Sequence, residues 1–191
     1  MPLPMIYQSG YLTVKDCNLR HNTFLLDFPN NEVKNGFVTM VANDYLKPRT
    51  QADNWTLDVV DALEAGNPDR FRKLLTAFLA DIPYTMRRKE TERERERYFH
   101  YTFYLLMRMV SCYTVYTEKQ QSEGRVDCIV EVPDYIYVFE FKLDGTAQEA
   151  LQQIEDKGYT RPYIADSRKL YRIGVSFSSE TGTVCDWAME E

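Results

Sequence analysis

Two runs of residues with strong β-strand propensity lie on either side of a single Pro-Asp pair. Residues 125–132 (RVDCIVEV) and 135–143 (YIYVFEFKL) are rich in valine, isoleucine, tyrosine and phenylalanine, and Pro133 and Asp134 separate them. β-branched and aromatic residues favour strands, whereas proline and aspartate favour turns. The segment therefore predicts a β-hairpin. Because proline cannot adopt the positive φ of a tight hairpin turn, we expect a loop of four residues or a bulge.

A capped helix and another strand follow the hairpin. Thr146 and Glu149 form a capping-box pattern at the start of TAQEALQQIEDKG, and Gly158 is placed to end this helix. Residues 169–178 (KLYRIGVSFS) then predict a strand, and residues 183–189 a further one. A strand–helix–strand unit forms a right-handed crossover between parallel strands, so the sheet is expected to be mixed.

The segment before the hairpin predicts one long helix and one strand. Residues 92–110 pass from a charged half into an apolar half without a helix breaker, and residues 112–120 (CYTVYTEKQ) have strand composition. The order from residue 92 onward is helix, three strands, helix and strand. The predicted fold class is therefore α/β, a mixed β-sheet with flanking helices.

The first half of the chain predicts two smaller segments. Residues 1–47 form an α+β appendage, with short strands at 11–15 and 23–27 and a helix that begins at Asn30 or Asn31.

Residues 48–91 predict connecting helices. The first ends at Gly66, and the next has Asn67 as its N-cap and Pro68 as its first helical residue. The predicted division is thus 1–47, 48–91 and 92–191.

The composition indicates a protein with a packed core in a reducing compartment. Hydrophobic residues make up 44% of the 191 residues, but no apolar run reaches the roughly 20 residues that span a bilayer. The start lacks a signal-peptide pattern, and the four cysteines are scattered. We expect a cytoplasmic protein with no membrane association. The net charge of −6 excludes a large basic footprint, and two histidines are too few for a histidine-based metal site.

The hairpin register brings two acidic residues together. A symmetric turn pairs residues whose numbers sum to 267, which places Asp127 opposite Glu140 on one face, with Lys142 beside them. Opposed Cβ atoms lie about 4.5–5.5 Å apart. Two carboxylates held this close repel each other unless a cation or a proton lies between them. The pattern predicts a site for Mg²⁺, which prefers oxygen ligands.

Other interpretations of the same residues stay open at this point. The three charges are also what an edge strand uses for solubility, and a register slip of one residue would separate Asp127 from Glu140. The opposite face, with Val126, Cys128 and Val130 against the aromatic residues of the second strand, is expected to face the core.

Asp127, a twelve-residue interval and Glu140-Phe141-Lys142 resemble the PD-(D/E)XK nuclease superfamily. The stretches GRVD, PDYIYVFEFKLDGTAQEALQQIEDKGY and KLYRIGVSFSSET resemble one of its bacterial families more closely, typically fused to the C-terminus of AAA-type ATPases. The resemblance is dense over residues 98–179. YQSGYLTV and FPNNEVKNGF resemble the place where the ATPase module of those proteins ends.

The resemblance implies a restriction-endonuclease-like core and a role for each matching residue. Asp127 and Glu140 would be metal ligands for Mg²⁺ or Mn²⁺, and Lys142 the catalytic lysine. Glu96 would support the metal from the preceding helix, and Gln153 would face the site from the following one.

Several of these assignments have competing interpretations. Glu92 is the rival to Glu96, and either could be a solvated acid in a charged run. Gln153 also suits an exposed helix position by propensity alone. We expect Tyr159 to pack in the core or at the helix end, and His100 to be a core histidine.

Three functions are consistent with the sequence. The first is a metal-dependent nuclease acting on nucleic acid, with DNA the expected substrate. The second is a nuclease fold kept as a binding or regulatory module beside an ATPase. The third is a structural role in which residues 1–47 form a dimerisation arm of a homodimer. Since no phosphate-binding loop (GxxxxGK[ST]) occurs, an ATPase module would have to act in cis or in trans.

Overall fold

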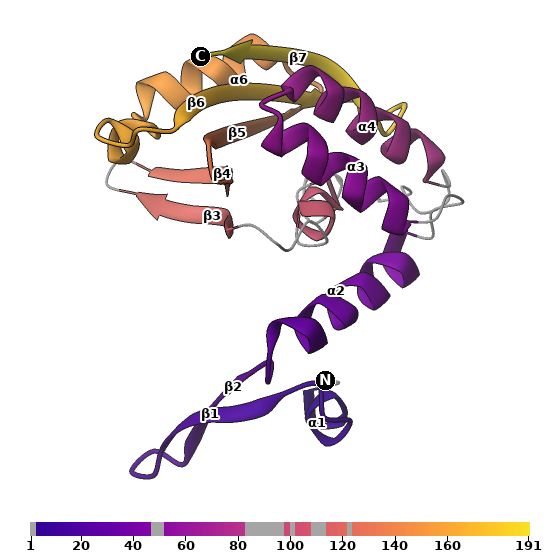
Figure 1. Cartoon of the computed structure of the whole chain (residues 1–191), viewed down its shortest axis with the longest axis vertical. Coiled ribbons are helices and arrows are strands. Elements are labelled where there is room, and N and C mark those ends of the chain that lie inside the picture. Colours follow the sequence, from indigo (N-terminus) through magenta and orange to yellow (C-terminus); the bar gives the residue numbers. More distant parts are fainter. Residues whose placement is uncertain (1–2, 47–51, 83–97, 100–101, 108–113, 122–123) are drawn as a thin grey trace. The chain divides into compact units, whose positions relative to one another are not determined.

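The structure is a computed structural model that describes residues 3–46, 52–82, 98–99, 102–107, 114–121 and 124–191. The chain divides into two compact units, Met1–Tyr45 and Leu46–Glu191, called here the N-terminal and C-terminal units. Figure 1 shows the elements of both, coloured from indigo at the N-terminus to yellow at the C-terminus.

The N-terminal unit contains a short helix, a β-hairpin and a longer helix. Their bounds are α1 (Leu3–Gln8), β1 (Thr13–Asn18), β2 (Thr23–Asp27) and α2 (Asn31–Leu46).

The hairpin and the cap of α2 follow the local sequence. The two strands pair with each other in antiparallel fashion, with an irregularity between Val14 and Asp16. The Asn30 side chain accepts a hydrogen bond from the Val33 backbone N–H at 2.9 Å, which identifies Asn30 as the N-cap of α2. Helix α1 was not predicted from the sequence.

The C-terminal unit is built on a five-stranded mixed sheet, which confirms the predicted α/β class. The strand order is β3-β4-β5-β6-β7, and only β5 and β6 are parallel. The strands are β3 (Thr114–Gln121), β4 (Gly124–Glu131), β5 (Tyr135–Leu143), β6 (Lys169–Phe177) and β7 (Val184–Glu190). Helix α6 (Ala147–Asp156) connects the parallel pair, and its Thr146–Glu149 capping box is present as predicted.

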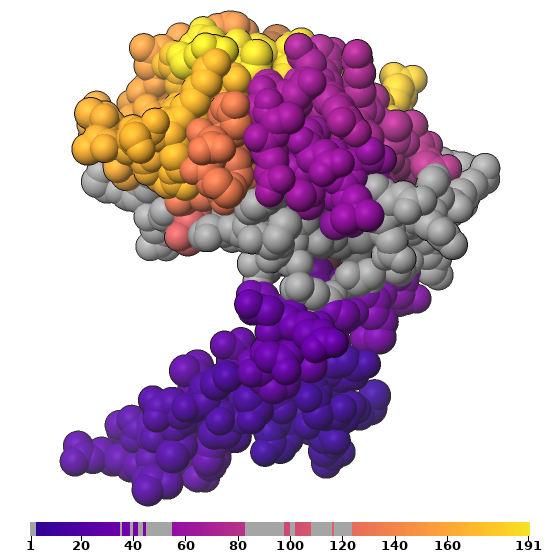
Figure 2. Space-filling model, viewed as in Figure 1, coloured from indigo at the N-terminus to yellow at the C-terminus, as the bar shows by residue number. Residues whose placement is uncertain are grey.

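One face of the sheet packs against α3 (Ala52–Glu64), α4 (Pro68–Asp81) and the helical residues 102–107. Phe71 of α4 contacts Phe139, with ring centroids 5.7 Å apart, and Phe103 contacts Phe141 at 4.4 Å. Asn67 caps α4 and Pro68 is its first residue, as predicted. In the space-filling view α3 and α4 form part of the surface of this unit (Figure 2).

Tyrosine hydroxyls anchor the turn between α3 and α4 to the sheet. The Tyr137 hydroxyl donates a hydrogen bond to the Leu63 carbonyl at 2.6 Å, and the Tyr171 hydroxyl donates to the Gly66 carbonyl at 3.3 Å. Both tyrosine rings are buried and stacked, with centroids 5.4 Å apart. The Leu63 carbonyl also accepts from the Gly66 N–H at 3.2 Å, so the tyrosine bonds add to the backbone bond that closes the end of α3.

Helix α6 covers the other face of the sheet. Its apolar residues join a buried cluster with the strands, formed by Val126, Ile129, Ile136, Val138, Leu151, Ile154 and Tyr159. Val126 was expected on the same face as Cys128, and that prediction is wrong, because Val126 belongs to the cluster that includes Ile129. Val126 lies beyond the last β4–β5 pair, Cys128–Phe139, on a part of β4 that pairs with β3 alone.

Among the helices of the described residues, none combines the length and the apolar composition needed to cross a bilayer.

Candidate active site

The hairpin has the register that the sequence predicted. The β4–β5 pairs run from Glu131–Ile136 to Cys128–Phe139, and each pair sums to 267. Four residues connect the strands, and the Val132 N–H donates to the Tyr135 carbonyl at 3.0 Å within this loop. Asp127 and Glu140 are therefore the next residues along the two strands.

At Asp127 a side-chain hydrogen bond replaces the backbone hydrogen bonds between β4 and β5. The Asp127 carboxylate accepts a hydrogen bond from the Phe141 N–H at 2.9 Å. The Asp127 N–H in turn lies 3.4 Å from Oε2 of Glu140 and donates to it. The two acidic residues are thus in direct contact at the point where β4 and β5 stop pairing.

Glu140 is a buried acid with a strongly shifted pKa. Glu140 is only 2% exposed to solvent. Burial raises its pKa to about 8, and the neighbouring Asp127 charge adds to this, whereas hydrogen bonds from the Asp127 N–H and Gln153 and the charge of Lys142 act in the opposite direction. The Glu140 carboxyl therefore takes up a proton far more readily than an exposed glutamate does.

Gln153 connects Glu140 to Lys142. Its Nε2 donates to Oε1 of Glu140, and its Oε1 accepts from the Lys142 ammonium at 2.5 Å. A carboxylate can only accept and an ammonium can only donate, so a side-chain amide is suited to bridge them. Gln153 faces this cluster from α6, as the resemblance implied.

The structure thus brings four of the predicted site residues into one cluster: Asp127, Glu140, Lys142 and Gln153. Their roles as metal ligands or catalytic groups stay predictions. Glu96, its rival Glu92 and His100 lie outside the described residues. Within the described part of the chain, no three His, Cys, Asp or Glu side chains are grouped closely enough to hold a metal ion.

Two residues that the sequence did not single out set the position of α6 over the site. Gly174 of β6 pairs with Glu140, and a Cβ atom there would lie 2.1 Å from the Ala147 carbonyl oxygen. The start of α6 can rest on β6 only because residue 174 has no side chain. The Asp186 carboxylate also accepts a hydrogen bond from the Ala147 N–H at 2.8 Å.

No short-range pattern marks Gly174 or Asp186, because their partners are distant in sequence. Asp186, for example, lies 39 residues from Ala147.

Comparison with known proteins agrees with this geometry. Residues 94–187 match the model of a family described as PD-(D/E)XK nuclease superfamily. This segment includes the mixed sheet, α6 and the four clustered residues. Residues 94–187 therefore belong to the PD-(D/E)XK nuclease superfamily.

A longer protein resembles nearly the whole chain. An uncharacterized protein in the vnfD 5' region of Azotobacter chroococcum mcd 1 is 30% identical over 190 residues. The match covers 97% of this chain but only 37% of the length of that relative. Both units of this chain are thus included in the match.

Proposed function

We propose that residues 94–187 form a metal-dependent nuclease domain that hydrolyses phosphodiester bonds in nucleic acid, with DNA as the expected substrate. The observation that supports this proposal is the cluster of two acids, a lysine and a bridging glutamine inside the segment that matches the nuclease superfamily.

The two acids fit a hard divalent cation such as Mg²⁺ or Mn²⁺. Asp127 and Glu140 would each supply carboxylate oxygen, Glu96 is the proposed further ligand, and water or substrate would complete the coordination. Burial first and the Asp127 charge second raise the pKa of Glu140, and a cation bound here would offset both effects on its carboxylate. When bound, such an ion lowers the pKa of a coordinated water and neutralises charge on phosphate oxygens.

Lys142 and Gln153 have complementary roles in this proposal. The Lys142 ammonium would hold the attacking water or offset the negative charge that develops on the phosphate group. Gln153 accepts from Lys142 and donates to Glu140. By standing between them it takes the place of a direct ion pair between the ammonium and the Glu140 carboxylate.

Cleavage assays with matched lysine variants test the proposal. Supercoiled plasmid and single-stranded DNA are incubated with Mg²⁺ or Mn²⁺ and with wild type, Glu140→Ala, Lys142→Met or Lys73→Met. Lys73 is an exposed lysine of α4 and serves as the control. We expect wild type and Lys73→Met to cut and the two site variants not to cut. Equal cutting by all four proteins, or none by any across RNA and DNA substrates, would refute the nuclease proposal.

A second candidate is a nuclease fold that binds or regulates without cutting. Two observations favour it: Lys142 is engaged with Gln153, and the chain carries a net charge of −6, which disfavours binding to a polyanion. Crystals soaked in Mn²⁺ distinguish the two. Metal bound by both Asp127 and Glu140 supports hydrolysis, whereas an empty site with Lys142 still on Gln153 supports the binding module.

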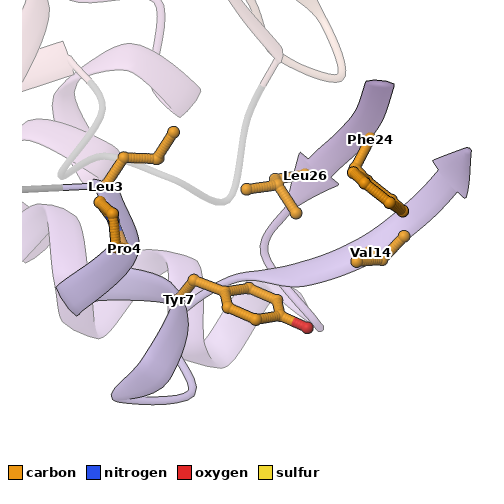
Figure 3. Close-up of a pocket in the computed structure, with 6 residues that line it drawn as sticks. All are labelled: Leu3, Pro4, Tyr7, Val14, Phe24 and Leu26. Carbon is orange, nitrogen blue, oxygen red and sulfur yellow. The ribbon is translucent and has the colours of Figure 1, made fainter. Parts of the chain in front are cut away.

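We further propose that the N-terminal unit is covered by an AAA-type ATPase module, in cis or in trans. None of the described side chains of this unit is buried. Its hairpin and α1 instead line an apolar pocket of about 350 Å³, formed by Leu3, Pro4, Tyr7, Val14, Phe24 and Leu26 (Figure 3). A two-stranded hairpin is marginally stable by itself, so an apolar partner is expected. The assignment of this partner as an AAA-type ATPase rests on the sequence resemblance.

Light scattering after size exclusion tests this partner. The chain alone should be monomeric, and co-expression with an AAA-type ATPase from the same organism should give a complex that Phe24→Asp disrupts. Phe24 is 56% exposed and lines the pocket, so the substitution should leave the C-terminal unit intact. A homodimer that Phe24→Asp converts to monomer would show instead that a second copy covers this surface.

A further inference from the structure

Tyr159 is turned toward the sheet by the way α6 ends. Gly158 has a φ of +59°, the Gly158 N–H donates to the Glu155 carbonyl, and the Tyr159 N–H donates to the Ile154 carbonyl. This is the pattern of a Schellman motif, which reverses the chain at the end of a helix. Tyr159 and Ile154 belong to the same buried cluster, and Tyr159 is only 2% exposed.

The hydroxyl of Tyr159 reaches the backbone at the start of β4. It donates a hydrogen bond to the Arg125 carbonyl at 2.8 Å. A Cβ atom on the adjacent Gly124 would lie 3.0 Å from the hydroxyl oxygen, so this approach leaves no room for a larger residue without adjustment. Arg125 is two residues before Asp127, on the part of β4 beyond its last pair with β5.

The same hydroxyl also touches the acid–lysine cluster. Burial raises the pKa of Tyr159, and the charges of Glu140 and Asp127 raise it further, while hydrogen bonds with the Gln153 side chain and at Arg125 act in the opposite direction. The contacts form a closed circuit. It runs from the Arg125 carbonyl to the Tyr159 hydroxyl, which is hydrogen-bonded to the Gln153 side chain, then from Gln153 to Glu140, and back to β4 through the Asp127 N–H.

We infer that Tyr159 is a positioning residue: its hydroxyl fastens the start of β4, which pairs with β3 but not with β5, to Gln153 and so fixes Asp127 against Glu140. β5 cannot supply this restraint, because pairing with it ends at Cys128. This inference rests on the proposed nuclease function for its catalytic meaning, but the restraint itself can be measured without any activity.

Two tyrosine-to-phenylalanine variants test the inference. Tyr159→Phe removes only the hydroxyl and leaves the ring in the core. Tyr163→Phe is the matched control, since its hydroxyl donates to Glu131 at 3.0 Å, at the opposite end of β4. Backbone amide hydrogen exchange over residues 124–128 is measured in both, together with kcat and KM for DNA cleavage.

We expect Tyr159→Phe to exchange about 2- to 10-fold faster over residues 124–128, the factor that corresponds to one lost hydrogen bond. Tyr163→Phe should exchange there as wild type does. If Tyr159→Phe does not fold, Gly124→Ala serves as a second variant. Its Cβ atom lies on β4 and would push the Tyr159 hydroxyl away, so amide exchange over residues 124–128 should again become faster. Unchanged exchange in the folded variant would overturn the inference.

The activity measurement separates positioning from mere packing. A lower kcat with unchanged KM in Tyr159→Phe, and neither change in Tyr163→Phe, supports a positioning role. Faster exchange with an unchanged kcat would refute that role. If wild type cuts no substrate, the nuclease proposal fails, and the exchange data still decide whether Tyr159 restrains β4.

Discussion

The substitution Glu140→Gln should change mainly how the free energy of unfolding depends on pH. The buried Glu140 carboxyl has its pKa raised to about 8 from the 4.5 of an exposed glutamate, chiefly by burial and then by the Asp127 charge. Between these two pH values the folded protein holds a proton that the unfolded chain has released. Stability of the wild type therefore falls as the pH rises through this window, and levels off above about pH 8.

The shift sets the size of the effect. The difference between about 8 and 4.5 corresponds to about 5 kcal/mol at about 1.4 kcal/mol per pH unit. A glutamine at position 140 stays neutral, but hydrogen bonds with Gln153 and the Asp127 N–H are weakened, which costs about 1–2 kcal/mol. The variant should thus be less stable than wild type at pH 5 and more stable by about 3–4 kcal/mol at pH 9.

Urea unfolding followed by tryptophan fluorescence measures this difference. Both tryptophans, Trp55 and Trp187, lie in the C-terminal unit, so the signal reports on the unit that contains Glu140. Titrations in EDTA at several pH values from 5 to 9 give the two curves. Taking the difference between the proteins removes contributions from the titrating groups that do not interact with Glu140.

Stability curves of wild type and Glu140→Gln that stay parallel from pH 5 to 9 would refute the argument, since Glu140 would then have an ordinary pKa. Adding Mn²⁺ provides a second check. A ligand at about 100 times its Kd stabilises a folded protein by about 2.7 kcal/mol, and this gain should be seen in wild type and reduced in the variant.

Three further substitutions test the surroundings of the site. Gly174→Ala places a Cβ atom 2.1 Å from the Ala147 carbonyl oxygen. The substitution should therefore lower the free energy of unfolding by about 1–3 kcal/mol in urea titrations and weaken stabilisation by Mn²⁺. Unchanged values would contradict the close packing of α6 on β6. Lys142→Met should reduce initial cleavage rates by about 100-fold or more while the melting temperature stays close to that of wild type, and a normal rate would remove lysine from the proposed chemistry. Tyr137→Phe leaves the Leu63 carbonyl without its 2.6 Å hydrogen bond, so urea unfolding should show a loss of about 1–2 kcal/mol without a change in the metal requirement.

Features that depend on neighbouring residues could be predicted from the sequence. The Pro133–Asp134 turn and two-residue alternation were sufficient for the hairpin register, and Thr146 with Glu149 was sufficient for the start of α6. Asn67 and Pro68 likewise marked the start of α4. Such signals can be read from sequence because backbone caps and turns involve groups only a few residues apart.

The candidate site residues could be predicted from that register and from the family resemblance. The contacts between their side chains could not. Alternation places Asp127 and Glu140 on one face, yet it does not show that β4 and β5 stop pairing there. It also assigned Val126 to the wrong face. The bonds of Asp127 to the Phe141 N–H and to Glu140 arise only once the ladder has ended.

The amino-acid order by itself determined which side chains could meet along the hairpin and where its following helix begins. Tertiary packing decided how deeply Glu140 is buried, and therefore its raised pKa, because desolvation depends on everything that covers a side chain. It also decided that Gln153 reaches Glu140, since Gly174 lets the start of α6 approach β6 closely. These contacts join elements that are far apart in sequence, so no local sequence pattern predicts them.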